Sequence, residues 1–261
     1  MKNKNLIIMT GVTSGIGNFI ADKLRHNFDL ALILRPKKIK TFKKKFISSS
    51  NKKKIYFFGF DLSHSNDYSL IKRKIKFKDY KSIDLIFCAG TLEKSSKKFN
   101  YNDWIQTFNT NVFSHLEIFN QLNQLLSKSK LTSKIIFFSG GGAASSFPDF
   151  PAYSASKTAL VRSIENLSEK FSKKKFNIFA VAPGAVETKM LKKVLRITSV
   201  GTKSKKEDVY NFISYALKAD TSTFHGRLIN IKDSIKKINK NKKNNFLKLR
   251  RVDEYLFNRD G

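Results

Sequence analysis

The chain has 261 residues, and its 51 Lys and Arg against 20 Asp and Glu give a formal net charge of +31. This length is enough to bury a sizeable core, and 41% hydrophobic residues exclude a globally disordered chain. A single cysteine, Cys88, excludes a disulfide scaffold, and no apolar run reaches the roughly 18 residues of a membrane-spanning helix. One cysteine also fits a reducing compartment, so we expect a cytoplasmic protein without a membrane span.

The net charge has two explanations, a basic surface that binds a polyanion and a compositional excess of lysine. Lysines gather in residues 37–54, in residues 72–81 and from 232 to 251. No aromatic RNA-binding motif is present, and no Cys and His residues have the spacing of a zinc site. We therefore favour compositional excess, and expect no nucleic-acid partner and no metal.

Short, mostly apolar runs alternate with helical patterns along the chain, beginning with a strand, a glycine-rich turn and a helix through Leu24. Strands are expected at 6–10, 30–34, 55–58, 83–87, 135–138, 178–181 and, more weakly, 228–231. Further helices are expected at 66–77, 101–127, 152–172 and 206–218. This alternation predicts an α/β fold, a Rossmann-type doubly wound parallel sheet of six to seven strands with helices on both faces. We expect one domain over residues 1–233 and a basic C-terminal tail over 234–261.

Glycines gather where the predicted strands end. The chain has 12, and eight of them follow four of those strands: Gly11, Gly15, Gly17, Gly90, Gly140, Gly141, Gly142 and Gly184. Strand carboxyl ends form the ligand-binding edge of an open α/β sheet. The first loop, Thr10 to Gly17, has the spacing GxxxGxG, which lets the backbone approach a pyrophosphate at a helix N-terminus. An ordinary tight turn is the alternative for this loop taken alone.

A second pattern, Tyr153-Ser154-Ala155-Ser156-Lys157, lies in a predicted helix, where Tyr153 and Lys157 stand one turn apart on one face. An ammonium group beside a phenol favours the phenolate and lowers the phenol pKa from about 10. The tyrosine could then act as a general acid or base near neutral pH. A surface Tyr–Lys pair is the alternative.

Together the two patterns resemble the short-chain dehydrogenase/reductase family, and the resemblance extends from residue 5 to about residue 233. Asp61-Leu62, Cys88-Ala89-Gly90, Asn111 and the loop from Pro183 to Thr188 match other family motifs in order. The resemblance implies a nicotinamide cofactor held by Gly11, Thr13, Ser14, Gly15, Ile16, Gly17, Arg35, Asp61, Leu62, Ala89, Gly90, Tyr153, Lys157, Pro183, Gly184, Val186 and Thr188.

The resemblance also implies an activity, hydride transfer between a nicotinamide and a carbonyl or alcohol carbon. Tyr153 would protonate the developing alkoxide, while Lys157 would lower the tyrosine pKa and hydrogen-bond the nicotinamide ribose. Asn111 would hold a water that connects the lysine to solvent. A serine after the fifth strand would orient the substrate carbonyl. The implied catalytic residues are Asn111, Ser139, Tyr153 and Lys157.

Two positions depart from the family pattern. The family serine stands thirteen residues before the tyrosine, where this chain has Gly140, and Ser139 comes one residue earlier. The three glycines that follow could let the loop shift and deliver Ser139; Ser145 or Ser146 could replace it, or no serine acts. Cys88 replaces the family asparagine, and we expect it to be a small buried apolar residue.

The end of the second strand bears on the choice of cofactor. An acidic residue there would accept the ribose hydroxyls and favour NAD, whereas this chain has Leu34-Arg35-Pro36-Lys37-Lys38. Arg35 suits a 2′-phosphate, since a guanidinium binds phosphate in a fork. We therefore expect NADP rather than NAD.

Several hypotheses for function remain open. The leading one is a carbonyl reductase or alcohol dehydrogenase acting on a small-molecule or carrier-bound carbonyl, either a 3-oxoacyl thioester or a sugar intermediate of surface-glycan assembly. The alternative is a regulatory protein of the same fold that binds the cofactor with little turnover. By resemblance we expect a homodimer or homotetramer, paired through apolar faces at Phe108, Val112, Leu116 and Phe119 and at Leu160, Ile164, Leu167 and Phe171.

Overall fold

Seven parallel strands form the central sheet of the computed structural model, which describes residues 4–47, 53–93, 98–197, 199 and 203–233. Their order across the sheet is β3-β2-β1-β4-β5-β6-β9. Their bounds are β1 Lys4–Thr10, β2 Asp29–Leu34, β3 Ile55–Gly59, β4 Tyr80–Phe87, β5 Ser133–Phe138, β6 Phe176–Ala182 and β9 Leu228–Asn230. The chain runs outward from β1 in one direction and then from β4 in the other, which confirms the predicted doubly wound sheet.

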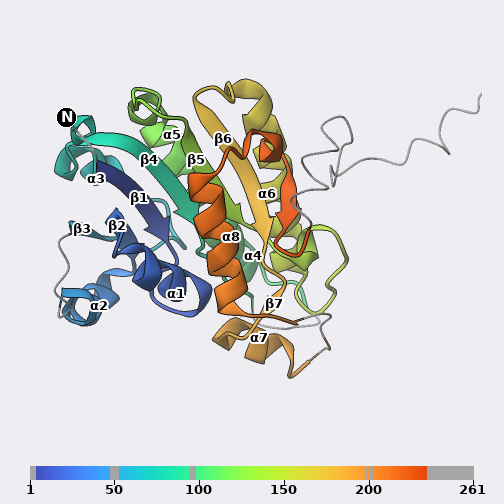
Figure 1. Ribbon diagram of the computed structural model, residues 1–261. Helices are drawn as coiled ribbons and strands as arrows, with labels where there is room; N and C mark the ends of the chain where they lie inside the picture. The colour runs from blue at the N-terminus through green and yellow to red at the C-terminus, as the bar shows by residue number, and fades with distance from the viewer. Residues whose placement is uncertain (1–3, 48–52, 94–97, 198, 200–202, 234–261) are drawn as a thin grey trace, which may run out of the picture.

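The two faces of the sheet carry separate apolar cores, because successive side chains of a strand point to opposite faces. In β1, Leu6 and Ile8 belong to one core, and Ile7 and Met9 belong to the other. Helices α1 (Gly15–Leu24), α2 (Ile39–Ile47) and α8 (Lys206–Lys218) cover the second core, and α8 and α1 lie in front of the sheet in Figure 1. Helices α3 (Ser69–Lys74), α5 (Ser114–Leu126) and α6 (Pro151–Lys170) cover the first.

Helix α2 lies in a lysine-rich stretch for which the sequence analysis expects no helix. Its apolar residues Ile39, Phe42 and Phe46 recur at helical spacing and pack on the sheet, while most of the lysines point to solvent. The rings of Phe42 and Phe46 stack with their centroids 4.5 Å apart. The expected helix 66–77 is also shorter than predicted, because it ends at Lys74 and a 3₁₀ turn (Phe77–Asp79) leads into β4.

The long helix expected at 101–127 is interrupted. Helix α4 (Tyr101–Phe108) passes through a π-helical turn (Asn109–Phe113) into α5. A π-turn accommodates an extra residue within a helix and is frequent at functional sites. Here it contains Asn111, which is fully buried.

A small second sheet lies beyond the carboxyl ends of the main strands. Strand β7 (Ala185–Val186) pairs in parallel with β8 (Lys203–Ser204), and helix α7 (Lys189–Val194) lies between them in the chain. Figure 1 places α7 below that edge of the main sheet. This arrangement brings the segment after Gly184 back over the ends of the strands. The proposed tail, 234–261, lies outside the described residues, so the predicted domain boundary stays a prediction.

The apolar stripes expected to pair two subunits are largely internal. Val112, Phe119, Leu160 and Ile164 are buried in the first core, and the other four residues of the stripes pack against it. The exposed large apolar side chains near this surface belong instead to α4 and its flanks: Phe99, Tyr101, Ile105 and Phe113. Among the described residues, no helix combines the length and apolarity needed to cross a bilayer.

Candidate active site

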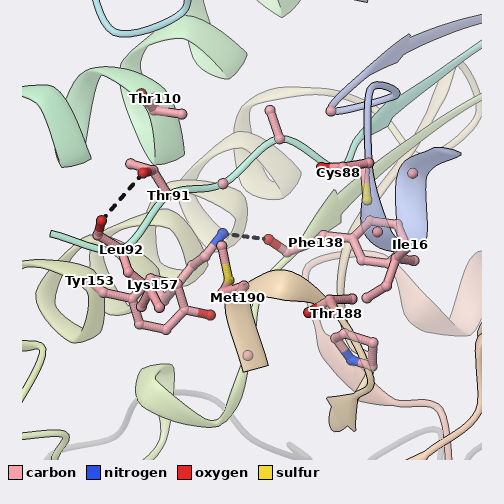
Figure 2. A pocket seen from close by; sticks show the side chains of 18 of the residues that line it. Ile16, Cys88, Thr91, Leu92, Thr110, Phe138, Tyr153, Lys157, Thr188 and Met190 are labelled. Atoms are coloured by element: carbon pink, nitrogen blue, oxygen red, sulfur yellow. Dashed lines mark hydrogen bonds between the residues drawn. The ribbon is translucent and has the colours of Figure 1, made fainter. Parts of the chain in front are cut away.

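A cavity of about 860 Å³ opens at the carboxyl edge of the sheet, where all four glycine-containing loops meet. Figure 2 shows this cavity with Tyr153, Lys157, Thr188 and Met190 among its lining residues. Every residue expected to hold a cofactor lines it: Gly11, Thr13, Ser14, Gly15, Ile16, Gly17, Arg35, Asp61, Leu62, Ala89, Gly90, Tyr153, Lys157, Pro183, Gly184, Val186 and Thr188. Ser139 lines it too, whereas Asn111 lies behind the wall.

The loop after β1 is packed so closely that side chains would not fit at two of its glycines. Gly11 has φ +72°, and a Cβ there would overlap the backbone nitrogen of Ala89 at the end of β4. A Cβ on Gly17 would overlap the carbonyl oxygen of Gly11. The side chain of Asn18 fixes the loop from within by donating to the Val12 carbonyl at 3.0 Å. The loop therefore brings its backbone close to the cavity at these glycines, while Thr13, Ser14 and Ile16 line the cavity beside them.

This loop also leads directly into the N-terminus of α1. The first turn of α1 has no acidic residue that would occupy its free N–H groups. Free N–H groups and the positive end of the helix dipole favour an anion there. The cradle thus fits the pyrophosphate of a dinucleotide.

Tyr153 and Lys157 lie one turn apart on α6, as expected, and both point toward the ends of β4 and β5. The Lys157 Nζ donates to the Phe138 carbonyl at 2.8 Å, the hydrogen bond drawn in Figure 2, and lies 5.8 Å from the centroid of the Tyr153 ring. Burial lowers the pKa of Lys157 to about 8. Burial, followed by the nearby Glu93 carboxylate, raises the pKa of Tyr153 to about 12.

The direction of the tyrosine shift is opposite to the lowering expected from the lysine. Loss of hydration destabilises the phenolate, and this effect outweighs the attraction of an ammonium group that is hydrogen-bonded elsewhere. As the chain stands, Tyr153 is a neutral phenol at physiological pH.

Asn111 ties the loop after β4 to helix α6. Its Oδ1 accepts from the Thr91 N–H at 2.8 Å, and its Nδ2 donates to the Thr91 carbonyl at 3.1 Å and to the Ser156 Oγ at 2.9 Å. A Cβ built on Gly90 would lie 3.6 Å from both Asn111 Oδ1 and Lys157 Nζ, so these three residues meet at one point. The π-turn places the amide of Asn111 at this junction.

The structure distinguishes the candidate serines by burial. Ser139 continues the sheet, since its N–H donates to the Val181 carbonyl at 2.8 Å. Its hydroxyl is buried, lines the cavity and has no hydrogen-bond partner among the described residues. Ser145 and Ser146 also line the cavity but are exposed. An unpaired buried hydroxyl is costly, so Ser139 is the serine placed to bond a ligand.

Gly140 occupies the position of the family serine, and the space beside it is filled by the tyrosine. A Cβ on Gly140 would lie only 2.8 Å from the Tyr153 hydroxyl oxygen. The absence of a side chain at residue 140 therefore leaves room for the phenol at the end of β5.

Cys88 sits beneath the glycine loop, with its Sγ 3.3 Å from where a Cβ on Gly17 would stand. Cys88 is half-buried and lines the cavity, rather than fully buried as expected. Loss of hydration raises the pKa of its thiol to about 12, so it stays protonated. Nearby, the buried His115 ring lies 3.3 Å from Thr10 Oγ1, which accepts from the Ala89 N–H. Burial, then Lys157, lowers the pKa of His115 to about 3, so its ring is neutral.

Arg35, which directly follows β2, lines the cavity and is exposed. Asp61 lies across from it, with its carboxylate accepting from the Ser63 N–H at 3.1 Å and from the Ser63 Oγ at 2.8 Å. These hydrogen bonds lower the pKa of Asp61, and the positive charge of Arg35 contributes. Lys37 and Lys38 are exposed and do not line the cavity.

The cavity lining also includes apolar residues, Leu92, Phe147, Met190, Leu191 and Val194, and polar ones, Gln106, Thr110, Ser145, Ser146, Lys189 and Ser199. The Phe147 ring meets the Tyr153 ring edge to face, with centroids 6.3 Å apart. The motifs in the sequence did not indicate Leu92, Phe147 or Glu93. Those three stand in irregular loops, where no periodic pattern marks an inward-facing side chain.

Comparison with known proteins agrees with this geometry. The family model for short chain dehydrogenase matches residues 5–197. An uncharacterized oxidoreductase of Schizosaccharomyces pombe is 28% identical over 215 residues, which is 80% of this chain and 81% of that protein. A benzil reductase ((S)-benzoin forming) of Saccharomyces cerevisiae is 22% identical over 195 residues, 72% of this chain and 74% of the relative.

Solved structures share the fold at lower identity. A short chain dehydrogenase of Shigella flexneri complexed with NADP has a TM-score of 0.76 and 19% identity, covering 89% of this chain and 98% of that one. A 4-hydroxyisoleucine dehydrogenase complexed with NADH has a TM-score of 0.73 and 18% identity, covering 87% and 96%. With its seven-stranded parallel sheet, its glycine-lined cavity and a family match over most of its length, this chain belongs to the short-chain dehydrogenase family of oxidoreductases.

Proposed function

We propose that this protein is an NAD(P)-dependent oxidoreductase that interconverts a carbonyl and an alcohol, with Tyr153 as the general acid/base. One observation carries the proposal: the half-buried Tyr153 and the buried Lys157, together with the unpaired Ser139 hydroxyl, line the same cavity as the glycine loop at the N-terminus of α1. A proton donor and an anion cradle thus belong to one site.

The residues present fit a nicotinamide dinucleotide. The loop from Gly11 to Gly17 would hold the pyrophosphate through backbone N–H groups. Lys157 and Thr188 line the cavity beyond it and would hold the nicotinamide ribose and the carboxamide. When bound, the nicotinamide supplies or accepts the hydride; the chain's own residues position both partners and handle the proton.

The protonation states favour the direction of carbonyl reduction. Because the pKa of Tyr153 is raised to about 12, the phenol holds its proton at neutral pH and can donate it to an oxygen that gains negative charge. The Lys157 ammonium would then stabilise the phenolate that remains. The Ser139 hydroxyl would donate a hydrogen bond to the same substrate oxygen, which is the role of an oxyanion-hole donor.

We propose NADP as the preferred cofactor on the basis of Arg35. Its guanidinium lines the cavity at the end of β2, and that position holds no acidic residue to accept the ribose hydroxyls. A guanidinium can bind a 2′-phosphate through two parallel hydrogen bonds.

The lining of the cavity bears on the substrate. Leu92, Phe147, Met190 and Leu191 would pack against an apolar group, whereas Gln106, Thr110, Ser145 and Ser146 line the same cavity and could bind hydroxyls. We propose an apolar carbonyl as the first choice, because the Phe147 ring packs against the Tyr153 ring. A 3-oxoacyl thioester with a short aliphatic chain and an aryl ketone both meet this requirement. The name of the yeast relative makes benzil a reasonable first probe.

The test is NADPH oxidation by the wild type and by Tyr153→Phe against benzil, a 3-oxoacyl thioester and a keto sugar. We expect turnover of an apolar carbonyl and a loss of at least about 10²-fold in the variant, with NADPH affinity unchanged within a few-fold. Tyr101→Phe, at an exposed tyrosine of α4, is the matched control and should keep full activity. Equal turnover by Tyr153→Phe would remove the role assigned to Tyr153. NADPH binding without turnover of any carbonyl would favour the regulatory alternative.

A further inference from the structure

Helix α6, which carries Tyr153, receives its N-terminal cap from another part of the chain. Glu93, in the loop after β4, accepts with Oε1 from the Ala152 N–H at 2.7 Å and with Oε2 from the Tyr153 N–H at 3.0 Å. The residue before the helix, Phe150, makes no side-chain cap, and the first turn of the helix has no acidic residue. Both carboxylate oxygens of Glu93 are therefore used on the turn that holds the tyrosine.

We propose that Glu93 is a positioning residue for Tyr153, which fixes the phenol in the cavity by clamping the first turn of α6 onto the loop after β4. This inference rests on the proposed function and adds to it a residue that no part of the motif pattern contains. Glu93 touches the backbone of the acid/base residue and acts through it.

A second connection reinforces the clamp from the other side of the same residue. The Ser156 Oγ donates to the Tyr153 carbonyl at 2.7 Å, and it accepts from Asn111 Nδ2 at 2.9 Å. Asn111 in turn holds both backbone groups of Thr91. The N–H and the C=O of Tyr153 are thus both tied to one four-residue stretch, Gly90 to Glu93, through Glu93 and through Asn111 with Ser156.

The position held in this way has little freedom. The Tyr153 hydroxyl lies where a Cβ on Gly140 would come within 2.8 Å, and its ring packs against Phe147. A small displacement of the first turn of α6 would move the hydroxyl away from the Ser139 side of the cavity. Misplacement of a reacting group by about 1 Å can cost about 10²-fold in rate.

The Glu93 carboxylate also has an electrostatic effect on the Tyr153 phenol. Among the residues that the structure describes, the charged groups facing Tyr153 are Glu93 and Lys157, and the negative charge of Glu93 opposes the phenolate. Glu93 itself is half-buried, and burial, with a smaller contribution from Asp103, raises its pKa, while the N–H groups of Ala152 and Tyr153 act in the opposite direction. Removing the charge should make the phenol easier to ionise.

The experiment compares Glu93→Ala, Glu93→Gln and Glu93→Asp in the full chain, with Glu169→Gln as control. Glu169 is exposed near the other end of the same helix, so this variant makes the same change of charge away from the cavity. Amide hydrogen exchange is measured at Ala152 and Tyr153, and kcat against pH is measured with the best carbonyl substrate.

In Glu93→Ala we expect exchange at both amides to speed up at least about tenfold and kcat to fall at least about tenfold, with NADPH affinity within about twofold. Glu93→Gln keeps one good acceptor, so it should retain most of the wild-type kcat. Because the negative charge beside the phenol is gone, the decrease of kcat at high pH should begin up to about one pH unit lower than in the wild type. Glu93→Asp reaches less far, so we expect an intermediate kcat. The control should match the wild type.

Two results would overturn the inference: unchanged exchange at Ala152 and Tyr153 in Glu93→Ala, or equal kcat profiles for Glu93→Ala and the wild type. Loss of stability alone, with kcat per folded molecule unchanged, would reduce Glu93 to an ordinary helix cap. Failure of the proposed function is recognised separately, because the wild type would then turn over no carbonyl while the exchange measurement still reports on the clamp.

Discussion

The two ends of the cavity are held in place by different kinds of contact. The end near α1 depends on close backbone packing: the loop from Gly11 to Gly17 lies so near the loop after β4 that a Cβ cannot be added at Gly11 or Gly17. The end near α6 consists of side chains that hold one another, with Glu93 and Asn111 fixing the helix that carries Tyr153. Backbone recognises what all dinucleotides share, whereas side chains determine the chemistry and the substrate. Substitutions at the two ends of the cavity should therefore impair different properties, cofactor binding at one end and catalysis at the other.

The largest effect is expected at the backbone end. Gly11→Ala places a Cβ on top of the Ala89 nitrogen in a backbone conformation, φ +72°, that strains an L side chain. We expect NADPH affinity to fall at least about 100-fold and the melting temperature to drop, measured by fluorescence titration and thermal unfolding. Gly141→Ala is the control, because a Cβ there meets no atom within 4 Å. Similar losses in both variants would contradict the close packing described for the loop.

The next effect should appear at the side-chain end, with binding spared. Gly140→Ala would bring a methyl group to 2.8 Å from the Tyr153 hydroxyl oxygen, so the phenol must move. We expect kcat to fall at least about tenfold while the NADPH dissociation constant changes less than about threefold. The same Gly141→Ala variant serves as control. A loss of cofactor affinity instead of kcat would mean that the two ends are not separable.

A smaller effect is expected at Arg35, the side chain that would bind the 2′-phosphate at the cofactor end of the cavity. Arg35→Ala should weaken NADPH by about tenfold, the loss of one charge-assisted contact, and leave NADH nearly unchanged. Lys37→Ala removes a neighbouring exposed charge that does not line the cavity, and it should alter neither. Equal weakening of NADPH and NADH by Arg35→Ala would show that Arg35 does not recognise the 2′-phosphate.

The smallest effect concerns stability beneath the cavity. The pKa of buried His115 is about 3, below the ordinary 6.5, so the unfolded chain takes up the proton first. The stability contributed by the neutral ring is complete above about pH 6.5 and is lost as pH falls toward 3, by at most about 1.4 kcal/mol per pH unit. Urea unfolding of wild type and His115→Gln at pH 7, 6 and 5 should show a steeper loss for the wild type.

Wild type and His115→Gln must be compared, because the buried Asp84 changes stability with pH in the opposite direction. Burial raises the pKa of Asp84 to about 7, so its contribution runs the other way between about pH 4 and 7. Asp84 is present in both proteins and cancels in the difference. Identical slopes would mean that His115 is accessible to protons in the folded chain.

The sheet could be predicted from the sequence almost strand by strand. Strands buried on both faces read as continuous apolar runs, and β2 and β6 are buried at every position. Helix α2 was missed because its lysines mask the spacing of Ile39, Phe42 and Phe46. The π-turn was missed because one extra residue leaves the apolar pattern on either side intact.

The residues of the candidate site could also be predicted only in part. Motif residues such as Gly11 and Tyr153 could be brought together from the sequence, because parallel strands deliver their following loops to one edge. Glu93 could not, since its partners are backbone N–H groups 59 and 60 residues away, and backbone groups leave no mark in a sequence. The direction of the Tyr153 pKa shift also depends on burial, which no spacing between Tyr153 and Lys157 encodes.

The π-turn at Asn109–Phe113 has a consequence for insertions and deletions in this chain. An α-helix turns about 100° with each residue, and the wider π-turn absorbs one extra residue without rotating α5 relative to α4. Deleting one residue there would restore regular helix and leave His115 and Phe119 facing the core. It would instead displace the buried amide of Asn111 from Thr91 and Ser156, so the site should suffer more than the fold.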